Sequence, residues 1–246
     1  MTPHTRRKLI HYWRRQIRPI LVLILVFTAA RSSIIDWNDV PSGSMNPTIF
    51  VGDRIFVNKL AYGLKFPFTT WHLLKWSEPS RGEIVIFYSP VDGVRLVKRQ
   101  VGLPGDHIVY KDGQLTITDK NGHTVPISYS AYSPTASELP KEQLRDHRFL
   151  MENLDGHEHI VAFFTDELIA RNLRENRKPP LRVYDRVLKD NEYFMMGDNR
   201  DNSNDSRFIG TVSRDQILGR SSRLMFSLDR DDFLLPRKSR FFKGLP

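Results

Sequence analysis

The chain has 246 residues, and its hydrophobic content of 40% is ordinary for a folded protein with one substantial core. It contains no cysteine, which excludes disulfides and thiol nucleophiles. The net charge of +9 is concentrated in residues 1–31, which carry seven Arg or Lys and no Asp or Glu. A nucleic-acid-binding protein would carry its basic excess on the folded body, so we expect contact with an anionic membrane and none with nucleic acid.

Two interpretations fit the N-terminal segment, in which a basic tail (residues 1–16) precedes an apolar stretch (residues 17–35). The stretch is short for a spanning helix, which needs about 20 residues, but Arg31 lies near its end and can reach the interface. It is either an uncleaved anchor or a signal peptide cut after the small residues Thr28-Ala29-Ala30. In both cases the basic tail stays in the cytoplasm.

From residue 36 onward the pattern is typical of β-structure. β-branched and aromatic residues predict strands at 54–57, 82–88 and 95–101. Between the first two lies a loop, 66–76, that is rich in Phe, Trp and Leu. These side chains either cover one end of the core or enter the lipid surface. The C-terminal segment 233–243 poses the same question more weakly.

The following segment resembles an inserted subdomain. Asp112-Gly113 and Asn121-Gly122 are typical hairpin turns, because both of their positions favour positive φ. They predict a meander of three strands, at 107–110, 114–118 and 123–128. Residues 129–190 are more polar and less regular.

Ser42 and Ser44 are separated by Gly43 in a bend that follows the apolar stretch. The bend lies between prolines and suits an exposed hydroxyl better than a packed strand. Alone it is an ordinary turn. A catalytic serine would also need a base to become a nucleophile.

Lys98 is the candidate base. None of the eight histidines has a familiar catalytic context, and His157 and His159 lack a third ligand, so we expect no metal. Desolvation in an apolar strand lowers the pKa of a lysine from its usual value of about 10.4. Strand alternation places Lys98 on the same face as Leu96. By itself, such a lysine is ordinarily an edge-strand or surface lysine.

Several segments together resemble the type I (leader) signal peptidases. They match that family's sequence boxes in order, over residues 41–48, 52–57, 81–87 with 98–106, and 197–207. A single Ser-x-Ser would carry little weight, but four boxes in order are specific. The likeness extends over roughly residues 17–224.

The resemblance implies a serine endopeptidase with a Ser-Lys dyad and without metal or cofactor. Ser44 takes the position of the nucleophile and Lys98 that of the general base. The oxyanion would be held by the Ser44 backbone N–H and the Ser42 hydroxyl, and Ser203 would orient the lysine. The other residues with family counterparts near the site are Asp198, Arg200 and the structural ion pair of Asp205 and Arg207.

The implied substrates are precursor proteins whose signal peptides are cut after small-x-small sequences such as Ala-x-Ala. Shallow apolar pockets would explain this preference, because a small side chain fits and a large one clashes. By position, we expect Val40, Met45, Leu96 and Val97 to line them. Two positions depart from the family pattern. Leu96 stands where an aromatic is frequent, and Glu83 stands where Asp is usual.

The resemblance also implies a single-pass protein of the cytoplasmic membrane, with a cytoplasmic N-terminus and a periplasmic catalytic domain. Besides the precursors, the expected partners are the lipid bilayer and the secretion translocon. This favours the uncleaved anchor, although Thr28-Ala29-Ala30 remains a candidate for self-cleavage.

We therefore expect a mostly β, antiparallel catalytic domain of the signal-peptidase/LexA-like type, with an inserted β-rich subdomain and one N-terminal membrane helix. The expected division is a basic tail 1–16, an anchor 17–35, a catalytic domain 36–106 and 190–224, an inserted subdomain 107–189, and a basic, aromatic tail 225–246. One alternative is a self-cleaving Ser-Lys repressor of the LexA kind, which would need a DNA-binding N-terminal domain. Another is a membrane-anchored binding module in which Ser44 and Lys98 merely pack.

Overall fold

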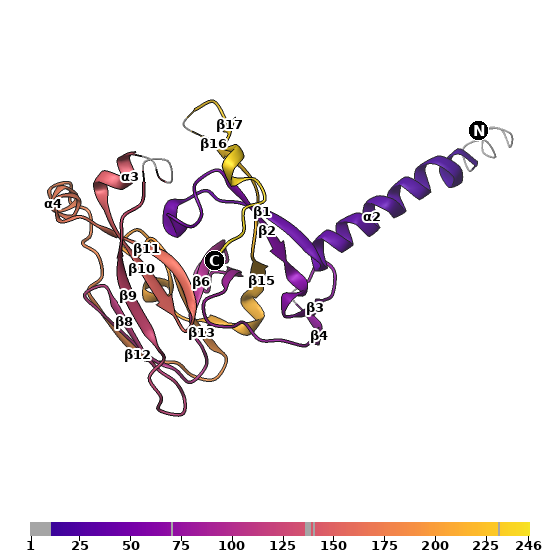
Figure 1. The fold of residues 1–246 in the computed structure, drawn as a ribbon. Coiled ribbons are helices and arrows are strands. Elements are labelled where there is room, and N and C mark those ends of the chain that lie inside the picture. The colour runs from indigo at the N-terminus through magenta and orange to yellow at the C-terminus, as the bar shows by residue number, and fades with distance from the viewer. Residues whose placement is uncertain (1–10, 70, 136–138, 140, 231) are drawn as a thin grey trace.

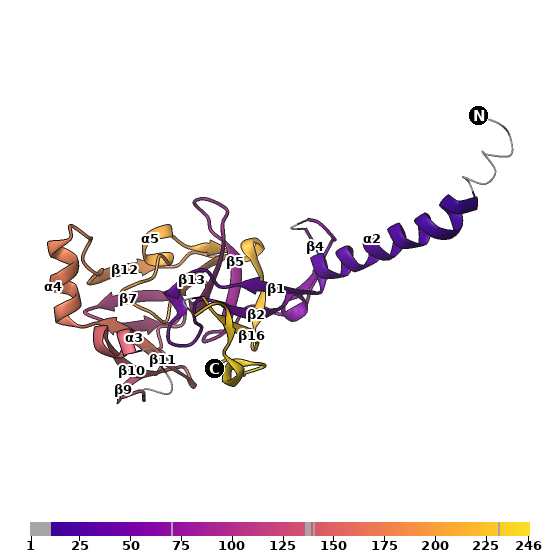
Figure 2. The ribbon, with the colours of Figure 1, turned by 90° about the horizontal axis from the view of Figure 1, so that it is seen from above.

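A computed structural model shows a helix that extends away from a β-rich body (Figures 1 and 2). The structure describes residues 11–69, 71–135, 139, 141–230 and 232–246. Residues 1–10 of the predicted basic tail and residue 70 of the predicted loop lie outside this description. Within the body, antiparallel strands predominate, which confirms the predicted fold class.

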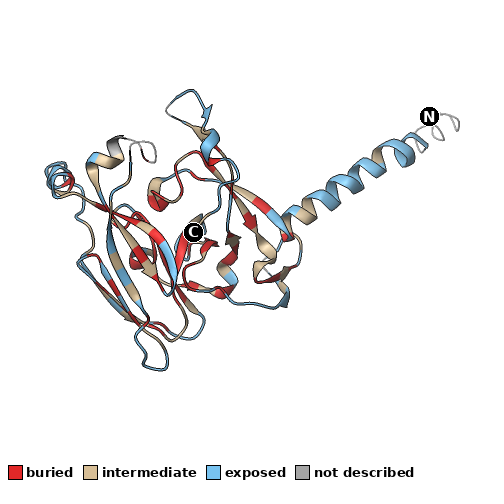
Figure 3. Cartoon of the chain, in the orientation of Figure 1, coloured by how far each residue is buried: buried red, intermediate tan, exposed pale blue. Residues whose placement is uncertain are grey.

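The N-terminal helix consists of a π-helical turn, Trp13–Ile17, and α2, Arg18–Ser33. At 21 residues it is long and apolar enough to cross a membrane. It starts earlier and ends slightly earlier than the predicted 17–35. Its side chains are exposed along most of its length (Figure 3), as expected for a helix whose apolar surface faces lipid.

The main sheet of the described chain has the strand order β14-β13-β6-β5-β15-β2-β16-β17, with β1 paired to β2. Its strands are β1 (Ile35–Asp39), β2 (Asp53–Asn58), β5 (Ile84–Tyr88), β6 (Arg95–Gly102), β13 (Glu192–Met196), β14 (Val212–Ser213), β15 (Ile217–Ser221), β16 (Leu224–Asp229) and β17 (Leu235–Pro236). Strands β2, β5 and β6 confirm the three that the sequence predicted. The sheet continues past residue 224, because β16 pairs with β2.

The segment between β6 and β13 forms two further antiparallel sheets. One consists of β7 (His107–Lys111), β8 (Gln114–Thr118) and β12 (Val183–Val187), and the other of β9 (Ile127–Tyr132), β10 (His147–Leu154) and β11 (His157–Phe164). Helices α3 (Lys141–Asp146) and α4 (Asp166–Arg174) complete it. Residues 129–190 are therefore more regular than the sequence indicated.

The predicted third strand of the meander, 123–128, is wrong. Only an isolated bridge between Thr118 and Thr124 extends the β7–β8 hairpin. Pro126 has no N–H to give to a ladder. Strand β9 instead begins at Ile127 and pairs with β10.

The segment between β6 and β13 shares a hydrophobic core with the main sheet. Ile108 and Leu154 are fully buried in one cluster with Val101 of β6 and Phe194 of β13. Burying such side chains stabilises the folded state by about 2 kcal/mol each. This segment is therefore packed against the main sheet over a common interior and is not merely tethered to it.

The predicted aromatic loop is a hairpin beside the N-terminal helix. Its strands are β3 (Gly63–Lys65) and β4 (His72–Lys75). Phe68 and Trp71 at its tip are 63% and 76% exposed, so they do not cover the core. The backbone N–H of Phe68 donates to Ser32 Oγ at 2.8 Å, which fixes the tip against the end of α2.

Short elements complete the body: the 3₁₀ turns Gly43–Met45, Lys59–Ala61, Arg214–Gln216 and Lys238–Arg240, and α5 (Ser206–Ile209).

Candidate active site

Ser44 lies in the 3₁₀ turn that connects β1 to β2. The next residue, Met45, is buried in the core together with Ile49, and these two apolar side chains anchor the turn. On the other side of the turn, the Ser44 carbonyl oxygen accepts a hydrogen bond from the Asn199 N–H at 3.1 Å. The apolar residues that follow Ser44 thus fix the position of its hydroxyl.

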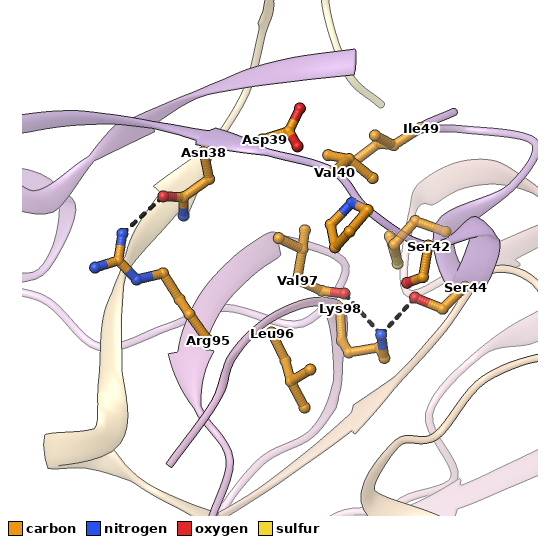
Figure 4. Close-up of a pocket in the computed structure, with 12 residues that line it drawn as sticks. Asn38, Asp39, Val40, Ser42, Ser44, Ile49, Arg95, Leu96, Val97 and Lys98 are labelled. Carbon is orange, nitrogen blue, oxygen red and sulfur yellow. Dashed lines mark hydrogen bonds between the residues drawn. The ribbon is translucent and has the colours of Figure 1, made fainter. Parts of the chain in front are cut away.

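Lys98 reaches Ser44 from β6, where it lies opposite Val85 of β5. Its Nζ donates to Ser44 Oγ at 2.6 Å and to the Val97 carbonyl oxygen at 3.0 Å (Figure 4). The side chain is almost fully buried. The structure thus brings together the two residues that the sequence singled out, 54 positions apart.

Burial lowers the pKa of Lys98 from 10.5 to about 8, although the nearby carboxylates of Asp205 and Asp198 act in the opposite direction. A lysine with that pKa is partly neutral at physiological pH. In its neutral form this amine lies within hydrogen-bond reach of the Ser44 hydroxyl and can accept its proton, as a general base does from its nucleophile.

A cleft of about 260 Å³ opens beside the Ser44–Lys98 pair. The four predicted pocket residues Val40, Met45, Leu96 and Val97 all line it, together with Ser42. Figure 4 shows the exposed Ser42 next to Ser44 at the same wall. The cleft can therefore hold a short apolar side chain next to the serine hydroxyl.

Sequence reasoning missed other residues that line the cleft. Asn38, Asp39, Ile49 and Arg95 also line it. Arg95 donates to Asn38 Oδ1 at 2.7 Å and so bridges β6 and β1 (Figure 4). Asn38 and Arg95 are polar residues on separate strands, and nothing in their local sequence indicates that they meet.

The segment 197–207 packs beneath the pair. A Cβ at Gly197 would lie 2.3 Å from Ser203 Oγ and 2.4 Å from the Ser44 carbonyl oxygen, so this position requires glycine. Ser203 is buried nearby, but its hydroxyl makes no hydrogen bond to Lys98 in this structure. Its predicted role in orienting the lysine stays a prediction.

Buried ion pairs fix this segment. Arg207 contacts Asp205 at 2.8 Å, as the sequence predicted. Asp198 accepts two hydrogen bonds from Arg99, each of 2.8 Å. Burial opposes the ionisation of Asp198, but Arg99 outweighs it and holds the pKa of Asp198 below its usual value.

Sequence reasoning also missed the partners of two charged residues in this segment. Arg99 directly follows Lys98, and its pairing with Asp198 was not foreseen. Arg200 pairs with Glu152 of β10, in the inserted subdomain, at 2.5 Å. Among the described residues, no three His, Cys, Asp or Glu side chains come together as a metal site.

Comparison with known proteins shows the family to which the chain belongs. The family model described as "Signal peptidase, peptidase S26" matches residues 13–226. The chain belongs to this signal peptidase family. It is therefore a hydrolase of the signal peptidase class, a serine peptidase that removes signal peptides from precursor proteins.

Individual members of the family match most of the chain. Signal peptidase I of Buchnera aphidicola (subsp. Acyrthosiphon pisum) is 31% identical over 90% of this chain and 77% of its own length. Signal peptidase I of Pseudomonas aeruginosa is 34% identical over 85% of this chain and 70% of its own. A crystal structure of a signal peptidase I from Enterococcus faecalis V583 covers 58% of this chain and 97% of its own, at 26% identity and a TM-score of 0.32.

Proposed function

We propose that Ser44 and Lys98 form the catalytic dyad of this signal peptidase. The observation that carries the proposal is the 2.6 Å hydrogen bond between Lys98 Nζ and Ser44 Oγ inside a buried site. Neutral Lys98 takes the Ser44 proton while Oγ attacks the scissile carbonyl carbon. The resulting ammonium gives that proton to the leaving amine as the peptide bond breaks. Lys98 then deprotonates a water, which attacks the ester and releases Ser44.

The negative charge of the tetrahedral intermediate needs donors beside Ser44. The Ser44 backbone N–H and the Ser42 hydroxyl fill this role in our proposal. Each such donor stabilises a transition state by on the order of 3 kcal/mol. The position of Ser42 beside Ser44 at the cleft wall supports the assignment.

We propose that the cleft selects small-x-small sequences and that the substrate adds as a strand. Strand β6 pairs with β13 only from Arg99 onward, so along the described chain its 95–98 edge has no strand partner on that side. An extended peptide can form main-chain hydrogen bonds there. Val40, Met45, Leu96 and Val97 would then contact its small side chains.

Buried ion pairs support the segment that lies beneath the Ser44–Lys98 dyad. Asp198, Arg200, Asp205 and Arg207 hold the segment beneath the dyad, and Ser203 lies beside it. The catalytic unit in this proposal is formed by 36–106 and 190–224, with 107–189 inserted.

We also propose that the protein is held at the cytoplasmic membrane by the N-terminal helix, with the body on the periplasmic side. The basic residues before the helix favour a cytoplasmic N-terminus. The exposed Phe68 and Trp71 lie beside the end of the helix, where they can enter the lipid interface. Because a signal peptide's apolar region lies in the same bilayer, anchoring raises the effective concentration of the cut site. The translocon stays a predicted partner.

The test is cleavage of a precursor with an Ala-x-Ala site by the full chain in detergent, with both products identified by mass. We expect one cut after the second Ala in wild type and none in Ser44→Ala. Replacing that Ala by Trp should abolish the cut, since the cleft cannot hold a large ring. Equal cleavage by Ser44→Ala would overturn the proposal.

A further inference from the structure

Asn199 makes two hydrogen bonds to the nucleophile turn. Its backbone N–H donates to the Ser44 carbonyl oxygen at 3.1 Å, and its side-chain Nδ2 donates to the Gly43 carbonyl oxygen at 3.2 Å. Asn199 is 2% exposed. It comes from the loop after β13, so the two bonds connect segments more than 150 positions apart in the sequence.

The side-chain bond has a particular geometric consequence. The Gly43 carbonyl and the Ser44 N–H belong to the same peptide group, which is planar and places its oxygen and hydrogen on opposite sides. A donor that holds the Gly43 oxygen therefore also sets the direction of the Ser44 N–H. That N–H is the oxyanion donor of the proposed mechanism.

Asn199 is itself held from both sides. Asp198, before it, is paired with Arg99, and Arg200, after it, is paired with the fully buried Glu152. Ala162 of β11 adds two backbone hydrogen bonds of 2.9 Å. Its N–H donates to the Asp198 carbonyl oxygen, and its carbonyl oxygen accepts from the Arg200 N–H. Such pairs stay formed because an unpaired buried charge is strongly unfavourable. The position of Asn199 is thus fixed by β6 and by the inserted subdomain.

We propose that Asn199 is a positioning residue that aims the Ser44 N–H at the developing oxyanion, and that the inserted subdomain serves to hold Asn199 in place. This inference rests on the proposed Ser-Lys mechanism. It gives the insert a catalytic purpose: β10 and β11 support the peptide group that stabilises the transition state. Asn199 does not touch the substrate, and its effect passes through the Gly43–Ser44 peptide.

The experiment compares Asn199→Ala and Asn199→Asp with wild type in cleavage of an Ala-x-Ala peptide by the full chain. Both substitutions remove the Nδ2 donor and keep the backbone bond to Ser44. Removing an oxyanion donor outright lowers kcat by about 100-fold to 1,000-fold. Because the Asn46 N–H also donates to the Gly43 oxygen, we expect a loss of about tenfold to 100-fold in kcat, with KM nearly unchanged.

A second readout separates positioning from loss of fold. A peptide aldehyde that ends in Ala forms a tetrahedral adduct with a serine hydroxyl, and its affinity should fall with kcat across the variants. The affinity for the product peptide that ends in Ala as a free carboxylate, which forms no tetrahedral adduct, should not fall. The matched control is Asn204→Ala, an exposed Asn of the same segment, which should retain wild-type kcat.

Three results would overturn the inference. They are a kcat within threefold of wild type in the folded Asn199 variants, a loss confined to KM, and failure of both variants to fold, which would make Asn199 a residue of the fold alone. Wild type and Lys98→Met are assayed alongside. An inactive wild type or an active Lys98→Met would refute the Ser-Lys mechanism itself, and so can be told apart from these outcomes.

Discussion

The rate of cleavage should rise with pH as Lys98 loses its proton. Burial lowers the pKa of Lys98 to about 8, and only the neutral amine can take the Ser44 proton. The perturbation is a change of pH. As pH falls below 8, the neutral fraction falls tenfold per unit, to about one tenth at pH 7 and one hundredth at pH 6. A lysine at its usual pKa would instead be neutral in only about 1 molecule in 3,000 at pH 7.

The assay is kcat/KM for an Ala-x-Ala peptide between about pH 6 and pH 10, because this ratio reports the ionisation of the free enzyme. We expect a slope of one decade per pH unit below about pH 8 and a plateau above it. Circular dichroism over the same range controls for unfolding. A rate that is flat from pH 6 to pH 8, or one that still climbs tenfold per unit above about pH 9.5, would refute the reasoning.

Three further predictions concern stability, packing and lipid. Below pH 8, Lys98 is protonated in both the folded and the unfolded protein, and burial of the charged amine destabilises the folded protein. Lys98→Met removes this charge, so it should raise the free energy of unfolding by about 3 kcal/mol below pH 8. The gain should vanish as the pH rises from 8, the pKa of Lys98 in the folded protein, to 10.5, its pKa in the unfolded protein. Denaturant titration at several pH values checks this, and a pH-independent gain would contradict it. Gly197→Ala should lower kcat by about 100-fold, because its Cβ would displace the Ser44 carbonyl oxygen; wild-type kcat would show that the turn can shift freely. Trp71 should be quenched by brominated lipids in vesicles, and unchanged emission would place the hairpin tip outside the bilayer.

Features that depend on neighbouring residues in the sequence could be predicted. Strands β2, β5 and β6 follow from β-branched runs, and the apolar N-terminal helix follows from composition. Ser44 and Lys98 could be singled out because each lies in a motif whose residues are close in sequence. The structure places their atoms 2.6 Å apart.

The rest depends on contacts between distant segments. Arg99 and Asp198 lie 99 positions apart, and although the resemblance places Asp198 near the site, nothing in the local sequence of either residue indicates that they form a buried pair. Glu152 lies in the polar insert, which gave no sign that it supports the active site. The third strand of the meander stops after the Thr118–Thr124 bridge that follows the Asn-Gly turn, because Pro126 has no N–H for the ladder and the chain then enters β9, which pairs with β10. Periodicity reveals which face of a strand is buried, but not which partner covers it.

The most direct test of the Ser-Lys dyad compares Lys98→Met with Lys65→Met. Lys65 is a second buried lysine, and burial together with the charge of Arg214 lowers its pKa to about 8 as well. Its Nζ, however, donates to the Ile217 carbonyl oxygen at 2.9 Å, away from Ser44. The measurement is the rate of precursor cleavage by each folded variant. Our account predicts loss of at least about 10,000-fold for Lys98→Met and a near wild-type rate for Lys65→Met. Cleavage by Lys98→Met within tenfold of wild type would contradict it.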